Sequence, residues 1–426
     1  MLIITKLILI MSNLKTINIL ILFLITTIQS QDLKASIEIF NQKNNPNIWW
    51  MNNNNNGKLP SNSGVEIFFS YKKNKQSLKF KLSNQYDVKN SIKFSESFFK
   101  YQLSSQTFLK VGRYYKDFSK YLNEDLSTGS LIVSKNARPF KKIGLVSEYP
   151  MKKINLHFGI LHGQLKKNAI YQKAPNVHEK FFYIDFKRKN EVFFSAGLVH
   201  SALWAGATYE YGDFPNEFSD FLKIFISADG PQDGGPHANA LGSHIGIWDF
   251  VYFKQLNKKF LAKMYYQHFF EDTSSFRFAN EIDGLWGFEI NSIENDISFL
   301  VEYLDTTHSD LNPPYQADTY YWNYQYQDGW RYRDKIIGNP FINPDSGPRG
   351  VYGHDQYKIL HLGTKLSLLD DYKLNIKISK IINTSSDIYH SISLSKYFKE
   401  KYQISFFNFG NGKDMAPKIS LTYYLN

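Results

Sequence analysis

The stretch VEIFFSYKKNKQSLKFKLS, residues 65–83, decides the fold class of this chain. Apolar side chains occupy every second position on both sides of a polar turn, with Val65, Ile67 and Phe69 before it and Leu78 and Phe80 after it. A period of two is the period of a β-strand, and two such runs joined by a short polar turn predict a β-hairpin with one apolar face.

The same alternation recurs along the chain, at residues 155–160, 297–303, 373–379 and 418–425. A local pattern of this kind defines an apolar face but leaves open whether that face meets a protein core or lipid. At roughly 22 residues per strand and connection, the chain accommodates about 18 strands. This number is plausible for a transmembrane barrel and very large for a soluble sandwich.

Composition favours the barrel. The 426 residues include no cysteine, which excludes a disulfide framework, a cysteine-ligated metal and a cysteine nucleophile. Aromatic residues make up 17% of the chain, yet the mean hydropathy is −0.38. Transmembrane barrels combine these properties because every second residue of a strand faces a polar lumen. We therefore predict an all-β fold, a transmembrane antiparallel β-barrel of about 18 strands with one or more short amphipathic helices.

Residues 1–30 have the order of a secretory signal peptide: two lysines without any acid, an apolar run at residues 17–28, and a small residue at the exit. We predict cleavage between Ser30 and Gln31, which leaves residues 31–426 as one outer-membrane barrel domain. A membrane anchor is the alternative, but the apolar run is short for a bilayer and has no stop-transfer flank. Residues 31–64, with five consecutive asparagines, are expected to be partly loop.

Two further segments need separate interpretations. Residues 192–209 contain no Asp, Glu, Lys or Arg and are as long as a transmembrane helix. Glycines and His200 make the segment less apolar than such a helix. Its alternation favours a strand that ends in a small-residue turn. Residues 214–228 place Phe218, Phe221, Leu222 and Phe225 at helical spacing. We expect a short amphipathic helix there, acting as a plug or as a cap on the periplasmic rim.

Several segments, in this order and at this spacing, resemble the Wzi family of capsule-assembly proteins. The quoted segments are residues 126–139 (LSTGSLIVSKNARP) after Gly112-Arg113, then residues 178–181, 197–200, 204–206, 241–244, 248–250, 266–272, 283–287, 329–333 and 337–340. The resemblance covers residues 112–339, and residues 329–340 are similar to versions found in Bacteroidetes-like bacteria. It implies an 18-stranded outer-membrane barrel with extra helices and a lectin-like role that holds capsular polysaccharide at the cell surface. The C-terminus departs from the usual barrel signature, because it ends on Asn426 instead of Phe.

We find no convincing catalytic constellation and predict no catalytic residue, no metal site and no cofactor. The strongest candidate binding feature is the aromatic segment 315–333. Sugar rings stack on flat aromatic side chains, and forked guanidinium groups pair with acidic sugars. The predicted polysaccharide-binding residues are Trp322, Trp330, Arg331, Arg333, Tyr320 and Tyr326. The alternative is an aromatic girdle at the lipid interface.

Three functional classes follow from this sequence. The first is a non-catalytic lectin-like barrel that anchors or helps to assemble capsular or surface polysaccharide, with outer-membrane lipid and lipopolysaccharide as neighbours and no nucleic-acid partner. The net charge of +11 suits acidic partners of this kind. The second is a substrate-selective porin for sugars or other small solutes. The third is a secreted β-rich enzyme. Conductance separates the first two, and membrane fractionation separates the third from both.

Overall fold

The fold is a closed barrel of eighteen antiparallel strands. The computed structural model describes residues 33–43, 45, 47–58, 61–85, 93–230, 240–271, 276–308, 320–344, 356–369, 371–383, 387–399 and 401–425. The barrel strands are β1 (Leu33–Gln42), β2 (Ser63–Lys73), β3 (Gln76–Gln85), β4 (Lys93–Gln102), β5 (Thr107–Arg113), β6 (Lys141–Pro150), β7 (Ile154–Gln164), β9 (Asn176–Arg188), β10 (Glu191–Trp204), β13 (Ser243–Gln255), β14 (Phe260–Phe270), β15 (Gly284–Ser292), β16 (Ser298–Asp305), β19 (Lys358–Leu369), β20 (Tyr372–Ile381), β21 (Ile388–Phe398), β22 (Tyr402–Gly410) and β23 (Met415–Leu425).

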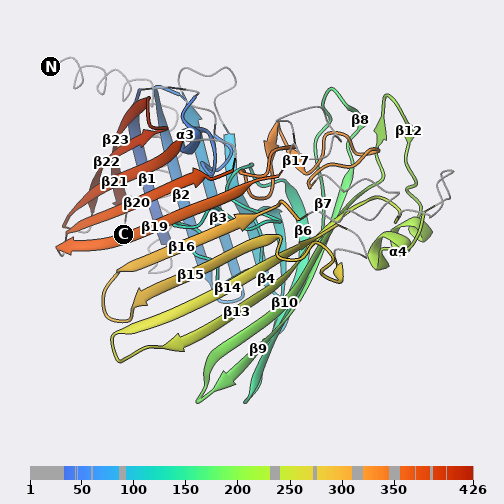
Figure 1. Ribbon diagram of the computed structural model, residues 1–426, viewed down its shortest axis with the longest axis horizontal. Coiled ribbons are helices and arrows are strands. Elements are labelled where there is room, and N and C mark those ends of the chain that lie inside the picture. Colours follow the sequence, from blue (N-terminus) through green and yellow to red (C-terminus); the bar gives the residue numbers. More distant parts are fainter. Residues whose placement is uncertain are drawn as a thin grey trace.

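The barrel closes because β1 pairs with both β2 and β23 (Figure 1). The hairpin predicted at residues 65–83 is formed by β2 and β3, with Ile67 opposite Leu82 and Phe69 opposite Phe80. The predicted fold class is therefore confirmed. The predicted signal peptide and its cleavage site at Ser30 and Gln31 lie outside the described residues.

The two ends of the barrel differ in the length of their connections. At one end, here called the turn end, neighbouring strands are joined by tight turns such as residues 74–75 and 189–190. At the other, the loop end, long segments join β5 to β6, β10 to β13 and β16 to β19. Outer-membrane barrels have short periplasmic turns and long extracellular loops, so the loop end faces the cell exterior. The long segments lie at the top of Figure 1.

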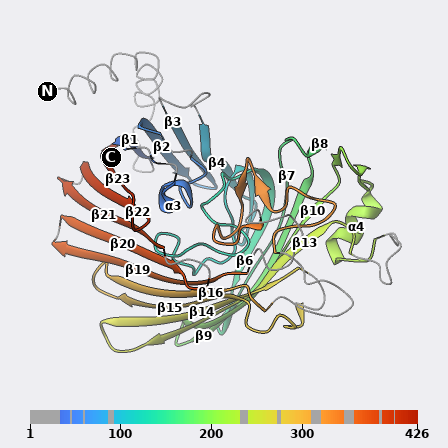
Figure 2. The ribbon, with the colours of Figure 1, turned by 45° about the horizontal axis from the view of Figure 1, so that its top comes forward.

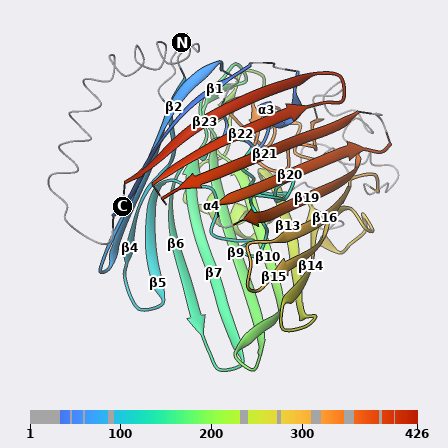
Figure 3. The same ribbon diagram turned by 90° about the vertical axis from the view of Figure 1, so that its left-hand side faces the viewer.

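The strand alternation sorts side chains between the outer wall and the lumen. Outward positions carry exposed apolar side chains, including Leu145, Ile160, Phe182, Phe288, Phe299, Val301, Leu360 and Leu421. Inward positions on the same strands carry buried polar groups such as Glu289 and Glu302. An apolar outside with a polar inside is the arrangement of a barrel surrounded by lipid. Figure 3 shows the strands of this wall from the side. In the described part of the chain, no helix is long and apolar enough to cross a membrane.

Two inward tyrosines depend on glycines in the neighbouring strands. Gly197 lies opposite Tyr183, and Gly287 lies opposite Tyr265. A Cβ atom at either glycine would collide with the tyrosine ring, so only glycine lets each ring lie flat against the wall. The hydroxyl groups of Tyr183 and Tyr265 then donate to the carboxylates of Asp249 and Glu302. The wall is thereby built to hold buried acids in fixed positions.

Helix α4 (Phe218–Ile226) lies within the segment whose spacing predicts a helix. A capping box between Glu217 and Asp220 starts it, and Ser227 ends it in the left-handed conformation. The interpretation as a plug or periplasmic cap is wrong. The helix packs on the outer wall at the loop end, where Ile224 contacts outward-facing residues of β10 such as Trp204. Figure 2 shows it outside the ring of strands.

The structure confirms the strand interpretation of residues 192–209, which precede α4. Most of them belong to β10, which ends at Trp204 and is followed by a turn in which Ala205 and Gly206 have positive φ angles. Two short strands follow, β11 (Ala207–Thr208) and β12 (Gly212–Asp213), which pair with each other, and β11 also pairs with β8 (Tyr171–Lys173). Near the N-terminus, a short helix α3 (Trp49–Asn52) connects β1 to β2 and buries Trp50 and Met51.

Candidate functional site

The lumen is filled by residues 114–140, the connection between β5 and β6, here called the plug. Its apolar side chains are buried in the main core, among them Tyr114, Phe118, Leu126, Leu131, Ile132 and Val133. At Gly129 the plug turns with φ +109°, and a side chain there would collide with Ser134. The plug therefore folds as a compact body inside the barrel, which Figure 2 shows from above.

Hydrogen bonds tie the plug to acidic groups on the inner wall. The Thr128 backbone N–H and hydroxyl group donate to Glu302, at 2.7 and 2.8 Å. The Ser119 hydroxyl group donates to Asp249 at 2.7 Å, and Lys120 pairs with Asp185 at 2.8 Å. Buried carboxylates are costly unless such donors satisfy them, so wall and plug stabilise each other.

A second segment, residues 320–344 between β16 and β19, lies on the plug and is here called the upper loop. It contains a small hairpin of β17 (Arg331–Tyr332) and β18 (Lys335–Ile336). The Trp330 indole N–H donates to the carbonyl of Ile132 at 2.7 Å, and the Asn339 amide donates to the carbonyl of Gly129 at 2.7 Å. Plug and upper loop thus form one body inside the barrel, below the loop end.

Three of the six predicted binding residues anchor this body. Tyr320, Tyr326 and Trp330 are only 3%, 2% and 3% exposed. The Tyr320 hydroxyl group donates to Asp283 at 2.7 Å, and that of Tyr326 to the carbonyl of Ala205 at 3.4 Å. Their positions make them supports of the upper loop, with Tyr326 also bordering a pocket described below.

The other three predicted residues are accessible but lie apart. Trp322 and Arg331 are half-buried, and Arg333 is exposed. Arg331 donates to the Asn343 side chain at 3.1 Å. Arg333 lies close to Arg138, whose pKa is lowered to about 10 by burial and then by the positive charge of Arg333. The structure therefore divides the aromatic segment between supporting and accessible positions instead of gathering it into one patch.

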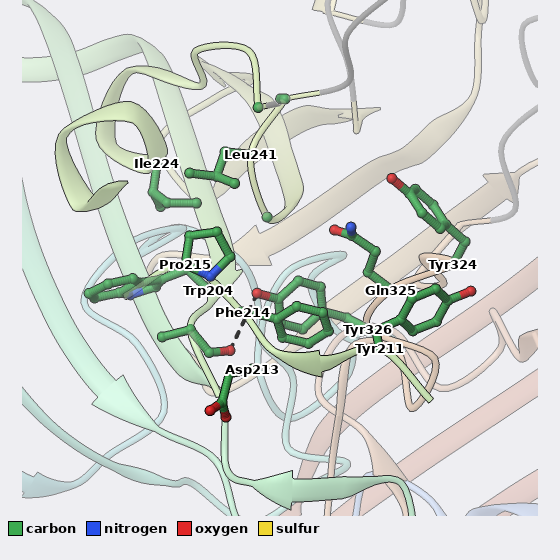
Figure 4. Close-up of a pocket in the computed structure, with 14 residues that line it drawn as sticks. Trp204, Tyr211, Asp213, Phe214, Pro215, Ile224, Leu241, Tyr324, Gln325 and Tyr326 are labelled. Carbon is green, nitrogen blue, oxygen red and sulfur yellow. Dashed lines mark hydrogen bonds between the residues drawn. The ribbon is translucent and has the colours of Figure 1, made fainter. Parts of the chain in front are cut away.

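A pocket of about 270 Å³ opens at the loop end between the upper loop and the connection from β10 to β13 (Figure 4). Its polar and aromatic lining includes Tyr211, Asp213, Tyr324, Gln325 and Tyr326. The rings of Tyr211 and Tyr324 lie edge to face, with centroids 6.4 Å apart. Its volume is at the low end of the roughly 300–1,000 Å³ range of small-molecule sites, which suits one sugar residue of a longer chain.

Sequence reasoning found one side of this pocket and missed the other. Tyr324 and Tyr326 belong to the aromatic segment 315–333, which the composition singles out, although residues 315–319 lie outside the described part of the chain. Tyr211 and Asp213 come from β12 and the turn before it, more than 100 positions away. No local pattern marks them, because they join the site only when β10 and the upper loop fold over the plug.

Among the described residues, one group has ligand atoms close enough for a metal ion, namely Asp283, Asp305 and His308 within 4.8 Å. Its carboxylates already accept hydrogen bonds. Tyr320 donates to Asp283 at 2.7 Å, as does the backbone N–H of His308 at 2.9 Å, and Tyr303 donates to Asp305 at 2.7 Å. Burial raises the pKa of Asp283 to about 6. We interpret the group as the network that fastens the upper loop to the wall.

The fold and this site define an outer-membrane β-barrel with a filled lumen and an elaborated extracellular end. The family model of the capsule assembly protein Wzi matches residues 50–344, more than half of the chain. The chain therefore belongs to this family and has a capsule-related role in the outer membrane. This confirms the resemblance seen in the sequence.

The chain also matches solved structures over most of its length, at low sequence identity. The crystal structure of Pseudomonas aeruginosa OpdQ matches 93% of this chain and 98% of its own, with 9% identity and a TM-score of 0.46. A triple mutant of the Rhodopseudomonas blastica porin matches 92% of this chain and 99% of its own, with 8% identity and a TM-score of 0.39. A search of curated proteins gives no match.

Proposed function

We propose that this protein retains surface polysaccharide at the extracellular end of the barrel by binding it, without catalysing a reaction. The observation that carries the proposal is the pocket lined by Tyr211, Asp213, Tyr324 and Gln325 at the loop end of the barrel. Aromatic faces suit the C–H surface of a sugar ring, while carboxylate and amide groups suit its hydroxyl groups.

Trp322, Arg331 and Arg333 extend this contact in the proposal, and Tyr320, Tyr326 and Trp330 position the loop that carries them. Each sugar contact is weak because a glycan is well hydrated before it binds. Retention then comes from many repeats of one polymer engaging many copies of the protein, which is avidity. A strain that lacks the protein should release glycan into the medium, while its total glycan synthesis stays near normal.

The test of the pocket is binding of the host strain's own surface polysaccharide to the purified protein, immobilised in detergent. A Tyr211→Ala, Tyr324→Ala double variant should bind roughly tenfold more weakly, because each aromatic contact contributes about 0.5–1.5 kcal/mol. Tyr209→Ala is the matched control, since Tyr209 is 68% exposed nearby but does not line the pocket. Equal binding by the double variant and the parent would refute the pocket assignment.

The accessible residues of the aromatic segment need their own variant. Trp322→Ala, Arg331→Ala and Arg333→Ala combined should release glycan from cells while the barrel still assembles, as judged by its altered migration on an unheated gel. Undiminished retention by this variant removes these residues from the proposal. Sugar-selective conductance of the parent in a planar bilayer would favour the porin alternative, and recovery in the soluble periplasmic fraction would favour the secreted enzyme.

A further inference from the structure

We propose that a groove on the outer wall at the loop end, between β4 and β9, binds a phosphorylated lipid of the outer leaflet. The groove has a volume of about 570 Å³. Its lining includes Phe94, Val111, Ile143, Arg113, Lys141 and His162. This site is separate from the polysaccharide pocket, which lies between the upper loop and the connection from β10 to β13 and shares no lining residue with the groove. The proposal rests on the outer-membrane location and does not depend on glycan binding.

The groove lies at the height of the lipid headgroups. Arg113 is the last residue of β5, and Lys141 is the first of β6. Gln164 and Asn176, which also line it, end β7 and begin β9. All four therefore lie where the wall leaves the membrane at the loop end, and long loops mark that end as extracellular.

The floor of the groove is apolar and faces away from the lumen. Phe94, Val111 and Ile143 are 49%, 42% and 51% exposed. The floor continues into the apolar outer wall, since Leu145 is the next outward residue of β6 after Ile143. An acyl chain can therefore pass from the surrounding lipid into the groove without leaving an apolar surface.

The upper edge of the groove carries positive charge. The Arg113 guanidinium donates to the carbonyl of Pro139 at 3.1 Å and to the Tyr332 hydroxyl group at 3.0 Å, both of which are neutral acceptors. Lys141 is exposed. Within the described ranges, no carboxylate forms an ion pair with either residue. Arg138 and Arg333 add to the positive field nearby. Phosphate groups match such cations in charge and, for arginine, in geometry.

Helix α4 borders the groove on its far side. Its Phe221 ring contacts His162 edge to face, with centroids 5.9 Å apart, and His162 also lines the groove. Lys180 of β9 donates to the carbonyl of Phe225 and so ties the helix to the outer wall. Phe218 and Ile226 point away from the barrel and are 74% and 71% exposed. An amphipathic helix with an apolar outer side, held at this height, fits the interfacial layer of the same leaflet.

A polysaccharide fits this surface less well than a lipid does. A hydrated glycan would cover Phe94, Val111 and Ile143 with hydroxyl groups that find few acceptors or donors there. A lipid that carries both acyl chains and phosphate satisfies the apolar floor and the charged edge together. We therefore assign the groove to a phosphorylated, multiply acylated lipid of the lipid A class.

The test is retention of lipid by the full-length protein in detergent, measured by native mass spectrometry. The probes are diphosphoryl lipid A, the same lipid after removal of its phosphates, and inorganic phosphate. The parent should retain diphosphoryl lipid A, and the dephosphorylated lipid and inorganic phosphate should bind much more weakly. Lys141→Gln should weaken retention about fivefold, as expected for one cation at a charged membrane surface. Ile143→Trp should weaken it by filling the floor.

Two matched controls separate the groove from general effects on the barrel. Leu145→Trp adds the same bulk one outward position further along β6, and Lys254→Gln removes an exposed lysine near the turn end of β13. Both should retain lipid A like the parent. Parental retention by Lys141→Gln and Ile143→Trp, or equal retention of the dephosphorylated lipid, would overturn the proposal, as would displacement of lipid A by the polysaccharide. Lys141→Gln should still bind polysaccharide, so failure of one proposal does not imply failure of the other.

Discussion

Two parts of the inner wall, here called the acidic half and the hydroxyl half, follow the same alternation but carry different chemistry. The acidic half, from β9 to β19, presents acceptors to the plug at inward positions: Asp185, Asp249, Gln267, Glu289 and Glu302. In the same half, His361 donates to the carbonyl of Leu126 in the plug. The hydroxyl half, formed by β21 to β23, presents small hydroxyl groups: Ser391, Ser393, Ser395, Ser405, Ser420 and Thr422. Part of it lines a polar cavity of about 260 Å³.

The difference shows that inward polar residues of barrel strands can have two roles. A buried carboxylate needs donors, and the plug brings its backbone N–H, hydroxyl and lysine groups to the acidic half. Serine hydroxyl groups can satisfy one another across strands, as Ser395 and Ser405 do at 2.7 Å. The acidic half is therefore a binding surface for the protein's own plug, and the hydroxyl half is an ordinary lumen wall.

Removal of the plug should have the largest effect on the difference between the two halves. Replacing residues 116–138 by a short Gly-Ser linker should leave the acidic half facing water and open the lumen. Single-channel conductance in planar bilayers should rise from near the baseline to a porin-like level. A matched deletion of residues 216–229, which removes α4 from the outer wall, should leave conductance at the baseline. An unchanged conductance after plug removal would show that something other than the plug closes the barrel.

Substitution of a single inward residue should lower the free energy of unfolding more in the acidic half than in the hydroxyl half. Glu302→Ala leaves the Ser127 and Thr128 donors unpaired in a buried site, and we expect it to lower the free energy of unfolding by about 3–5 kcal/mol. Thr422→Val, on the hydroxyl half, should cost about 1 kcal/mol or less. Denaturant titrations followed by gel migration would measure both. Similar losses for the two variants would remove the distinction between the halves.

A smaller effect should appear as a pH dependence at the rim of the acidic half. Burial raises the pKa of Asp283 from 3.8 to about 6, where Asp305, His308 and Tyr320 surround it. The stability that protonation provides is thus fully present below about pH 4 and is lost as the pH rises through 6, a change of at most about 3 kcal/mol. Hydrogen exchange of residues 320–333 should therefore be slower at pH 4.5 than at pH 7.5, after correction for intrinsic exchange. Asp283→Asn should flatten this difference, and a persistent difference in that variant would assign it to another group.

The smallest effect is expected at Asp296, an accessible acid in the turn between β15 and β16. Burial alone would raise its pKa, but Lys365 and Lys373, at 2.6 and 2.9 Å, outweigh burial and lower it. Its contribution is therefore present above its ordinary pKa of 3.8 and lost as the pH falls, which is the opposite sign to Asp283. Asp296→Asn should cost less than about 1 kcal/mol in denaturant titrations at neutral pH, and 0.5 M salt should shrink the loss further. A loss as large as that of Glu302→Ala would contradict this ranking.

The candidate site was only partly predictable. The density of tyrosine, tryptophan and arginine in residues 315–333 correctly drew attention to the upper loop, but density does not distinguish a ring that meets solvent from one that meets a plug. Trp330 is buried because Ile132 accepts its indole N–H, and these residues are 198 positions apart. The plug contributes residues 126–139 to the family resemblance, but no local pattern in it predicts that it lies inside the barrel, between two strands that pair directly.

The sequence by itself determined the strands and the existence of α4, because each depends on a period that neighbouring residues carry. An apolar residue at every second position makes a strand, and four aromatic or aliphatic residues at helical spacing make an amphipathic helix. The tertiary structure decided that α4 packs outside the barrel, that the plug lies inside it, and which side of Tyr326 meets the pocket. These outcomes depend on contacts such as that between Ser127 and Glu302, which join residues 175 positions apart. Such pairs exist only after the wall has closed, because closure is what creates the enclosed space in which their burial becomes favourable.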